Sequence, residues 1–442
     1  MACNLLRQRL HRRSTLPSLL HPGVDQLPKI GIAVLCNLRG SGIDDQSDLV
    51  RVPMGPCGSH FLRQVADHSA TCESRDDSQM TFTSNPLRIA FDSYWLDDGP
   101  PSGTNVVTSQ IETWASVFPS DQIQLWGSSA QGDRTRSLTK LSNIQSRPRR
   151  LRQHGLSNLL ELGRVKCDVV LSQNFAPLRT RGLSAVFFHD AIFSSHPEWF
   201  SRAERTYLNL AAQSLSRADL VFTSSEAEAR RIAAEYPRVE GKIHSIGLGL
   251  SREFERANPA RPNLPLDEGG FILVVGRLNV RKNLRRLQDA LLKDGTISKE
   301  LPLVVVGAAD GVAGASMDVR TQRAVSDGAI LYAGFLPDSE LKWLYQHCRL
   351  FTFPSLDEGF GMPILEALSC GAPMALSDIP AFREFGDVAR FFDPADEDHI
   401  RDVVVDALAS VGDRPGMSPV RTWESSVATA RNLVVNALTG SK

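Results

Sequence analysis

The sequence lacks the features that mark several specialised classes of protein. It contains seven cysteines, an odd number, and no C-x-x-C pair, so neither a zinc site nor a disulfide framework is indicated and a reducing compartment is favoured. No apolar run approaches the ~20 residues of a membrane-spanning helix. The formal net charge of -1 provides no overall field for a polyanion, so we expect no nucleic-acid partner.

The composition is that of an ordinary globular protein, with 42% hydrophobic and 22% charged residues. Its 442 residues suit two or three domains. The first 84 residues differ from the rest, because short apolar pieces alternate with Pro, Gly and charges without a sustained period. Four arginines and no acid precede Val24, as in a transit peptide, but an unstructured extension or a wrongly chosen start codon is the simpler interpretation. We expect residues 1–84 to be a poorly ordered extension.

From residue 85 onward, short apolar runs alternate with helical patterns, which is typical of βαβ units around a parallel sheet. Residues 85–255 would form one such domain, 256–270 a linker rich in Pro, Asn and Gly, and 271–422 a second domain. The predicted fold is α/β, with two Rossmann-like, doubly wound parallel-sheet domains facing a cleft where the strand ends converge. The expected strands are 87–91, 122–125, 169–171, 185–188, 220–223 and 243–246, then 271–275, 303–306, 330–332, 350–353, 374–376 and 390–392.

The segment 353–373, FPSLDEGFGMPILEALSCGAP, carries the clearest chemical signal. It predicts a strand end, a glycine-rich loop and a helix that starts near Pro363, since proline suits the first helical turn. Gly359 and Gly361 would let the backbone approach a ligand closely. The free N–H groups at the helix start would then cradle a diphosphate.

Two carboxylates flank this cradle, Glu358 in the loop and Glu366 in the first helical turn. Carboxylates accept hydrogen bonds from sugar hydroxyls, so one on each side of a diphosphate suits a ligand with a sugar at either end. The alternative is structural: Glu366 would complement the helix dipole and Glu358 would be a solvated loop charge. The glycine-rich context favours the ligand interpretation.

Cations follow the first strand of the second domain in the stretch VVGRLNVRKNL. Arg277 follows a glycine at the strand end, and Lys282 comes five residues later. At the same sheet edge as the glycine loop, both would neutralise a diphosphate and stabilise the leaving group. A solvated basic loop is the alternative, and we assign that role to Arg281, Arg285 and Arg286.

Together these residues resemble glycosyltransferase family 4, the retaining GT-B enzymes that include bacterial polysaccharide mannosyltransferases. The pair Glu358 and Glu366 matches the E-x(7)-E hallmark, and the stretches 334–345 and 370–373 match further blocks over about 350 residues. The resemblance implies that Glu366 holds the nucleotide ribose and Glu358 the transferred sugar. It also implies that a helix at 423–442 crosses back onto the first domain. The implied diphosphate ligands are Arg277 and Lys282, assisted by Gly359, Phe360, Gly361 and Met362.

The first domain matches the family less tightly. Its first strand is followed by a glycine loop, 99–104, in which Gly103 would approach the donor, or which would be an ordinary strand-to-helix turn. His189-Asp190 follows the strand 185–188, and the stretch to Trp199 resembles bacterial mannosyl- and rhamnosyltransferases. His189 would therefore face the cleft and hydrogen-bond the donor sugar.

The resemblance implies a glycosyltransferase that moves a hexose from a nucleoside-diphosphate sugar to a saccharide or lipid-linked saccharide. GDP-mannose is the favoured donor, and a UDP- or TDP-sugar is left open. No cofactor and no metal are expected, because cations and a helix terminus can replace a divalent ion. The implied reaction retains configuration through front-face attack, without an enzymic base. A cytoplasmic location is expected, with peripheral contact with the inner membrane face left open. A non-catalytic nucleotide-sugar-binding pseudoenzyme, a sugar epimerase and an inverting transferase are the alternatives. A dinucleotide oxidoreductase is disfavoured because no G-x-G-x-x-G follows either first strand.

Overall fold

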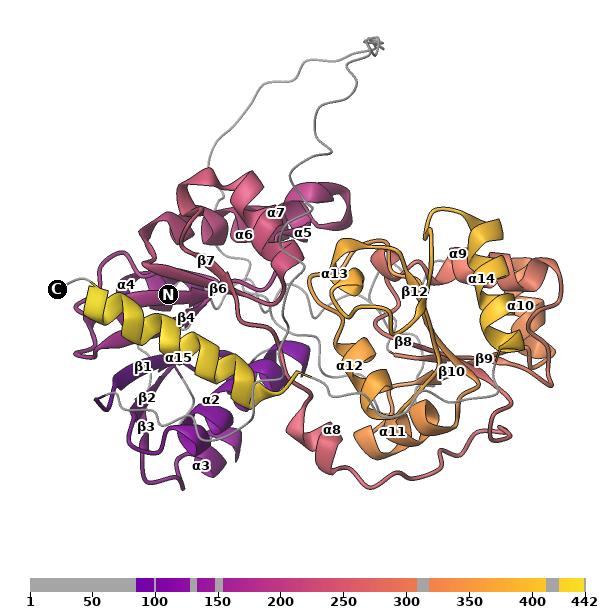
Figure 1. Cartoon of the computed structure of the whole chain (residues 1–442), viewed down its shortest axis with the longest axis horizontal. Helices are drawn as coiled ribbons and strands as arrows, with labels where there is room; N and C mark the ends of the chain where they lie inside the picture. Colours follow the sequence, from indigo (N-terminus) through magenta and orange to yellow (C-terminus); the bar gives the residue numbers. More distant parts are fainter. Residues whose placement is uncertain are drawn as a thin grey trace, which may run out of the picture. The chain divides into compact units, whose positions relative to one another are not determined.

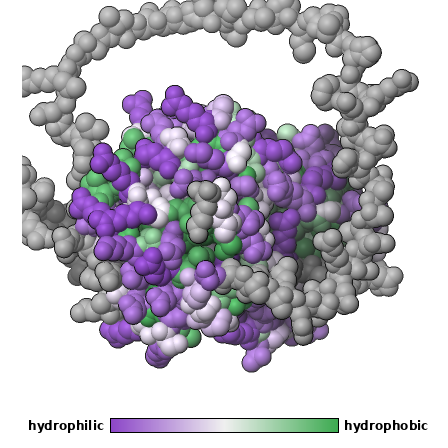
Figure 2. Space-filling view, turned by 60° about the vertical axis from the view of Figure 1, so that its left-hand side comes forward, coloured by the Kyte–Doolittle hydropathy of each residue, from purple (hydrophilic) through white to green (hydrophobic). Residues whose placement is uncertain are grey.

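The computed structural model describes residues 85–98, 101–127, 133–147, 154–307, 318–410 and 421–440. All of them belong to one compact unit, Thr81–Lys442. The expected N-terminal extension lies outside the described residues. Within them, no helix is both long enough and apolar enough to cross a bilayer. Figure 2 shows hydrophilic residues over most of one face, with hydrophobic residues in smaller areas between them.

The first sheet contains seven parallel strands in the order β3-β2-β1-β4-β5-β6-β7. β3 was not expected from the sequence. It is an edge strand with the residues IQSR, of which Ile144 is buried in the core, so it has no alternating apolar pattern to reveal it. The strands are β1 Arg88–Asp92, β2 Gln122–Trp126, β3 Ile144–Arg147, β4 Val169–Gln173, β5 Leu183–Phe187, β6 Leu220–Thr223 and β7 Ile243–Ser245.

The second sheet contains six parallel strands in the order β10-β9-β8-β11-β12-β13 (Figure 1). Its central strands are short runs such as ILVV and LVVV in which every residue is buried, as expected where helices cover both faces of a parallel sheet. The strands are β8 Ile272–Val275, β9 Leu303–Val306, β10 Ile330–Gly334, β11 Leu350–Phe353, β12 Met374–Ser377 and β13 Arg390–Phe392.

Helices cover both faces of the second sheet. One face packs on apolar residues of α9 (Leu284–Lys293), α10 (Val319–Ser326) and α14 (Glu397–Ala409). The other packs on α11 (Asp338–His347) and α12 (Met362–Ser369). The segment from 257 to 270, which follows α8 (Arg252–Arg256), has no regular structure and runs along α11, where the Ala260 N–H bonds the Ser339 carbonyl at 3.0 Å.

The last helix, α15 (Trp423–Gly440), lies against α2 (Pro101–Val117) of the first domain, where the sequence predicts it (Figure 1). Arg431 of α15 is buried and donates to both carboxylate oxygens of Asp121, at 2.8 and 2.9 Å. Its guanidinium also lies over the Phe118 ring, 4.6 Å from the centroid. Asp121 accepts further bonds from the Leu87 N–H and the Trp114 indole, so this carboxylate joins four parts of the chain.

Strand order decides where a ligand can bind. In both sheets the chain starts centrally, runs outward to one edge and then continues from the centre toward the other edge. The crevice lies where the direction reverses, at the carboxyl ends of β8 and β11 in the second sheet and of β1 and β4 in the first. The residues that follow these four strands are therefore the candidates for a site.

Candidate active site

The start of α12 is open. Gly361 precedes the helix with φ 121°, and no side chain caps it. The N–H groups of Phe360, Gly361 and Met362 make no hydrogen bond within the described part of the chain. A side chain at position 361 would come within 3.0 Å of Ile364 and 3.1 Å of the Phe382 ring, so glycine is required on two grounds. Such a terminus is an anion site.

Lys282 ends the short 3-10 turn η5 (Val280–Lys282), which follows β8. Its ammonium lies 2.5 Å from Glu358 Oε1 and 4.3 Å from the centre of the Phe353 ring. Gly276 leaves room for this position of the Lys282 side chain, because a Cβ at residue 276 would lie only 3.1 Å from it. Burial lowers the pKa of Lys282, although Glu358 opposes that shift. Arg277 is exposed at the end of β8, near enough to Lys282 to help lower that pKa.

Glu358 is buried, 7% exposed, and is held by two cations. Besides Lys282, Arg281 donates to its Oε2 at 2.5 Å. Burial acts to raise the pKa of Glu358, but the two cations outweigh it and the pKa is lowered. The carboxylate is therefore ionised and is not the solvated loop charge of the alternative interpretation.

The solvated role expected for Arg281 is wrong. Its side chain is 26% exposed, and its carbonyl accepts the Leu356 N–H at 2.8 Å, which fixes η5 against the loop after β11. Arg286 is also engaged, with the Pro394 carbonyl and Asn283. Arg285, whose side chain is 80% exposed, is a solvated charge as expected.

Glu366 lies in the second turn of α12 and not in the first, because the helix begins at Met362, one residue before the expected start. Its carboxylate accepts the Tyr345 hydroxyl at 2.9 Å. Burial raises the pKa of Glu366 to about 7, while the bond from Tyr345 and the charge of Lys282 act in the opposite direction. A helix dipole acts mainly on the first turn, so it does not explain this position. Tyr345 was not singled out from the sequence, although it ends the family-like stretch 334–345.

His189 follows β5 and is joined to the end of β4. Gln173 turns its amide nitrogen to Gln110 Oε1 at 3.2 Å, so its oxygen faces His189 Nε2, also at 3.2 Å. The His189 ring stacks on Trp95, with centroids 5.5 Å apart. Burial lowers the pKa of His189 to about 4, so the ring is neutral near pH 7. In the tautomer that the Gln173 oxygen favours, Nε2 donates the proton and Nδ1 is left as an acceptor.

The expected loop position of Gly103 is wrong. α2 already begins at Pro101, so Gly103 lies in the first helical turn. The next residue, Thr104, bonds the Trp95 carbonyl at 2.7 Å, and Trp95 stacks on His189. Among the described residues, no contact is found between Gly103 and the glycine-rich loop that follows β11 (residues 354–361, the donor loop).

The donor loop and the His189 segment are in direct contact. Ser224 and Ser225, which follow β6, donate to the Gly359 carbonyl at 3.0 and 2.7 Å. A Cβ at Gly359 would lie 2.9 Å from the Asp190 Cβ and 3.5 Å from the His189 carbonyl. The structure therefore brings Glu358, Gly359 and His189 to one place, with Arg277, Lys282 and the start of α12 beside them.

α7 (Glu226–Glu235) supplies further charges to this contact. Ser225 caps the helix by accepting the Glu228 N–H at 3.1 Å. The Glu228 carboxylate does not complete the capping box, because it accepts the Ala191 N–H at 2.9 Å instead. Burial raises the pKa of Glu228 to about 8. Arg231 bridges to Asp357 at 2.6 Å, so α7 also contacts the donor loop.

A polar network at the end of β1 was missed from the sequence. Asp92 is buried and accepts from His154 at 2.8 Å, Asn158 at 2.7 Å and the Gln173 N–H at 3.1 Å. Burial acts to raise the pKa of Asp92, but His154 and Asn158 outweigh it and the pKa is lowered. Asp92 and His154 are 62 residues apart, so spacing gives no signal for them.

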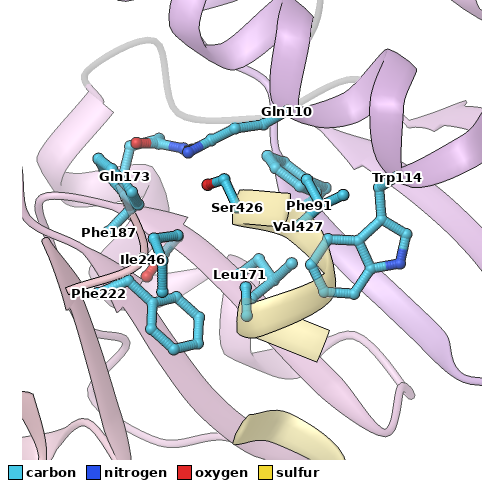
Figure 3. Close-up of a pocket in the computed structure, with 12 residues that line it drawn as sticks. Phe91, Gln110, Trp114, Leu171, Gln173, Phe187, Phe222, Ile246, Ser426 and Val427 are labelled. Carbon is cyan, nitrogen blue, oxygen red and sulfur yellow. Dashed lines mark hydrogen bonds between the residues drawn. The ribbon is translucent and has the colours of Figure 1, made fainter. Parts of the chain in front are cut away.

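A separate cavity of about 20 Å³ lies between the first sheet and α15 (Figure 3). Its lining is mostly apolar, with Phe91, Leu171 and Phe222 facing Val427. That volume suits about one water molecule and excludes a nucleotide. Among the described residues, no group of three or more His, Cys, Asp or Glu side chains is arranged to hold a metal ion.

Comparison with known proteins identifies the second domain. Residues 257–409 match the family model described as "Glycosyl transferases group 1". This segment is therefore similar to the group 1 glycosyltransferases, and we call it the glycosyltransferase domain. This glycosyltransferase domain contains both glutamates, both predicted diphosphate ligands and Arg281.

Two relatives from Escherichia coli match more of the chain than the glycosyltransferase domain. The O-antigen chain mannosyltransferase B is 31% identical over 257 residues, which cover 56% of this chain and 64% of that protein. The serotype-specific mannosyltransferase WbdA is 32% identical over 215 residues, which cover 46% of this chain and 26% of that protein. The chain thus spans less than two thirds of either relative.

A solved structure of Anabaena Alr3699/HepE in complex with UDP has a TM-score of 0.54 and 18% identity, over 80% of this chain and 98% of that chain. At that identity the likeness bears on the fold alone. It confirms the predicted GT-B arrangement, in which the glycosyltransferase domain and a second Rossmann-like domain face each other.

Proposed function

We propose that this protein is a retaining, metal-independent hexosyltransferase that transfers mannose from GDP-mannose to a saccharide or lipid-linked saccharide. The observation that carries the proposal is the buried, ionised Glu358, paired with Lys282 and placed beside the open start of α12. The start of α12 can bind an anion, and Glu358 can accept hydroxyl groups. Both lie where the strand order of the second sheet reverses, which suits a ligand that joins a sugar to a diphosphate.

The donor is held by three kinds of group in this proposal. Its diphosphate accepts bonds from the N–H groups of Phe360, Gly361 and Met362 and from the side chains of Arg277 and Lys282. Glu366 accepts the ribose hydroxyls, which is supported by its place one turn beyond the cradle. On the other side of the diphosphate, Glu358 and His189 Nδ1 accept hydroxyls of the transferred sugar.

The reaction breaks the bond between the sugar anomeric carbon and the β-phosphate oxygen. An acceptor hydroxyl forms the new bond on the same face, and its proton passes to the departing phosphate oxygen, so configuration is retained. The cations and the helix terminus stabilise the charge that develops on this phosphate and so take the role of a divalent ion. The neutral state of His189 suits hydrogen bonding to an uncharged hydroxyl.

The choice of mannose is supported by two relatives that are named mannosyltransferases. For location, we propose the cytoplasm with peripheral contact at the inner membrane face. The buried thiols of Cys167, Cys348 and Cys370 suit a reducing compartment. Leu178 and Leu210 are 50% and 57% exposed, and Arg179 and Arg181 beside Leu178 are exposed too, which suits an anionic membrane surface.

A thermal-shift panel of GDP, UDP, TDP and ADP tests the donor. We expect GDP alone to raise the melting temperature of the wild type, and Glu366→Ala to abolish the shift, because a ligand stabilises the folded state in proportion to its binding. A shift with another nucleotide would replace GDP in the proposal. No shift with any of them would favour the non-catalytic pseudoenzyme.

The chemistry needs its own test. With labelled GDP-mannose and saccharide acceptors, we expect transfer that survives a chelator and a product with the donor's anomeric configuration. An inverted product would indicate an inverting transferase, and an altered sugar on the nucleotide would indicate an epimerase. Normal turnover by both Arg277→Ala and Lys282→Ala would contradict the diphosphate assignment.

A further inference from the structure

Arg281 is bonded to Glu358 but has no role in the proposed chemistry. It donates to Glu358 Oε2 at 2.5 Å and contacts the Asp357 carbonyl at 3.4 Å. Burial acts to lower the pKa of Arg281, but Glu358 and Asp190 outweigh it and the pKa is raised. The guanidinium thus stands among carboxylates of two domains.

Charged side chains from several elements lie around Glu358. From η5 come Arg281 and Lys282, and Arg277 lies near Lys282 after β8. The charges contributed by the other elements are Asp357 in its own loop, Asp190 after β5, and Glu228 and Arg231 on α7. Since Arg231 is already bonded to Asp357 and Glu228, the direct cationic partners of Glu358 are Lys282 and Arg281.

A bound donor changes this balance. Lys282 is assigned to both Glu358 and the diphosphate, and the diphosphate of the donor carries two negative charges where a carboxylate carries one. When Lys282 turns to the phosphate, Glu358 keeps a single cationic partner. A buried carboxylate that loses its last partner is costly and takes up a proton, which would leave it one acceptor fewer for sugar hydroxyls.

We propose that Arg281 is a positioning residue that keeps Glu358 ionised and aimed at the donor sugar while Lys282 engages the diphosphate. The inference rests on the proposed function and deepens it, because it divides the two adjacent cations between the sugar and the phosphate. Arg281 acts through Glu358 and touches neither the nucleotide nor the bond that breaks.

A pH dependence follows from this division. Removing Arg281 removes one of the interactions that lower the pKa of Glu358, so the effect of burial raises that pKa. The ionised form that binds the sugar is then lost as pH falls through the raised pKa. Sugar binding by the wild type has no such dependence above pH 6, because its Glu358 stays ionised.

The experiment compares Arg281→Met with Arg285→Met, a control in the same basic stretch whose side chain is 80% exposed. Dissociation constants for GDP and for GDP-mannose are measured by calorimetry at pH 6, 7 and 8. We expect Arg281→Met to weaken GDP-mannose binding about tenfold at pH 6 and less at pH 8, the size of one charged hydrogen bond. Binding of GDP changes less than about threefold, and Arg285→Met resembles the wild type for both ligands. Arg281→Lys, which keeps the charge, restores most of the affinity and flattens the pH profile.

Two results overturn the proposal in different ways. Equal, pH-independent binding of GDP-mannose by Arg281→Met and Arg285→Met, with GDP binding intact, removes the role of Arg281 and leaves the proposed function standing. Failure of the wild type to bind GDP removes the proposed donor and this inference with it. If Arg281→Met does not fold, Arg281→Lys decides the question, because it keeps the positive charge. A loss of GDP-mannose affinity by Arg281→Lys that does not depend on pH would show that the shape of Arg281 matters and not its effect on the ionisation of Glu358, which overturns the proposal.

Discussion

Replacing Gly361 with alanine separates two demands on the start of α12. The φ of 121° is unfavourable for any residue with a Cβ and costs about 1–3 kcal/mol. The added methyl also meets Ile364 at 3.0 Å and the Phe382 ring at 3.1 Å, an overpacking that costs about 1–3 kcal/mol more. We therefore expect Gly361→Ala to lower the free energy of unfolding by about 3 kcal/mol.

Gly386→Ala is a matched control in the same domain. Its φ is also positive, at 77°, but an added Cβ meets nothing within 4 Å, so the expected loss is about 1 kcal/mol. Both variants are compared by chemical denaturation and by GDP binding. To relieve the contact of the added methyl group, the backbone at position 361 must shift, which turns the N–H groups that form the diphosphate cradle. Gly361→Ala is therefore also expected to lose GDP affinity, whereas Gly386→Ala keeps it. Equal losses of stability and equal GDP binding would show that the contact geometry at Gly361 does not matter.

Two further predictions concern the half-buried Glu366 and the buried Asp121. Because burial raises the pKa of Glu366 to about 7 from an ordinary value near 4.5, its stabilising contribution is complete at low pH and is lost as pH rises through 7. Glu366→Gln should therefore be more stable than the wild type at pH 8, by about 1–3 kcal/mol in chemical denaturation, and a wild type equally stable at pH 5 and 8 would contradict the shift. Arg431→Met leaves the buried Asp121 without its cation and should lower the free energy of unfolding by about 3–5 kcal/mol. Chemical denaturation measures this loss beside the control Arg323→Met, which replaces an exposed arginine. A loss below about 1 kcal/mol would show that the packing of α15 does not depend on this pair.

The second sheet was predictable because its strands are short apolar runs between turn residues. β3 was not, since an edge strand of polar residues has no such pattern. For the site, the glycines, Glu358 and Lys282 stand out by spacing along one strand-loop-helix unit. Arg281 could not be told from its basic neighbours, because its burial depends on how η5 packs against the loop after β11. Asp92 and His154 meet only through the fold, and Gly103 was misplaced because α2 begins earlier than the glycines suggest.

The contact between the two domains at the site includes several neutral or singly charged hydrogen bonds besides the Arg231–Asp357 ion pair. Ser224 and Ser225 donate to the Gly359 carbonyl, and Glu384 accepts the N–H groups of Glu226 and Ala227 at the start of α7. Water can take over each of these bonds at small net cost, unlike an apolar contact of the same area. The polar contact over the donor loop therefore contributes less to holding the two domains together than the apolar packing of α15 on α2.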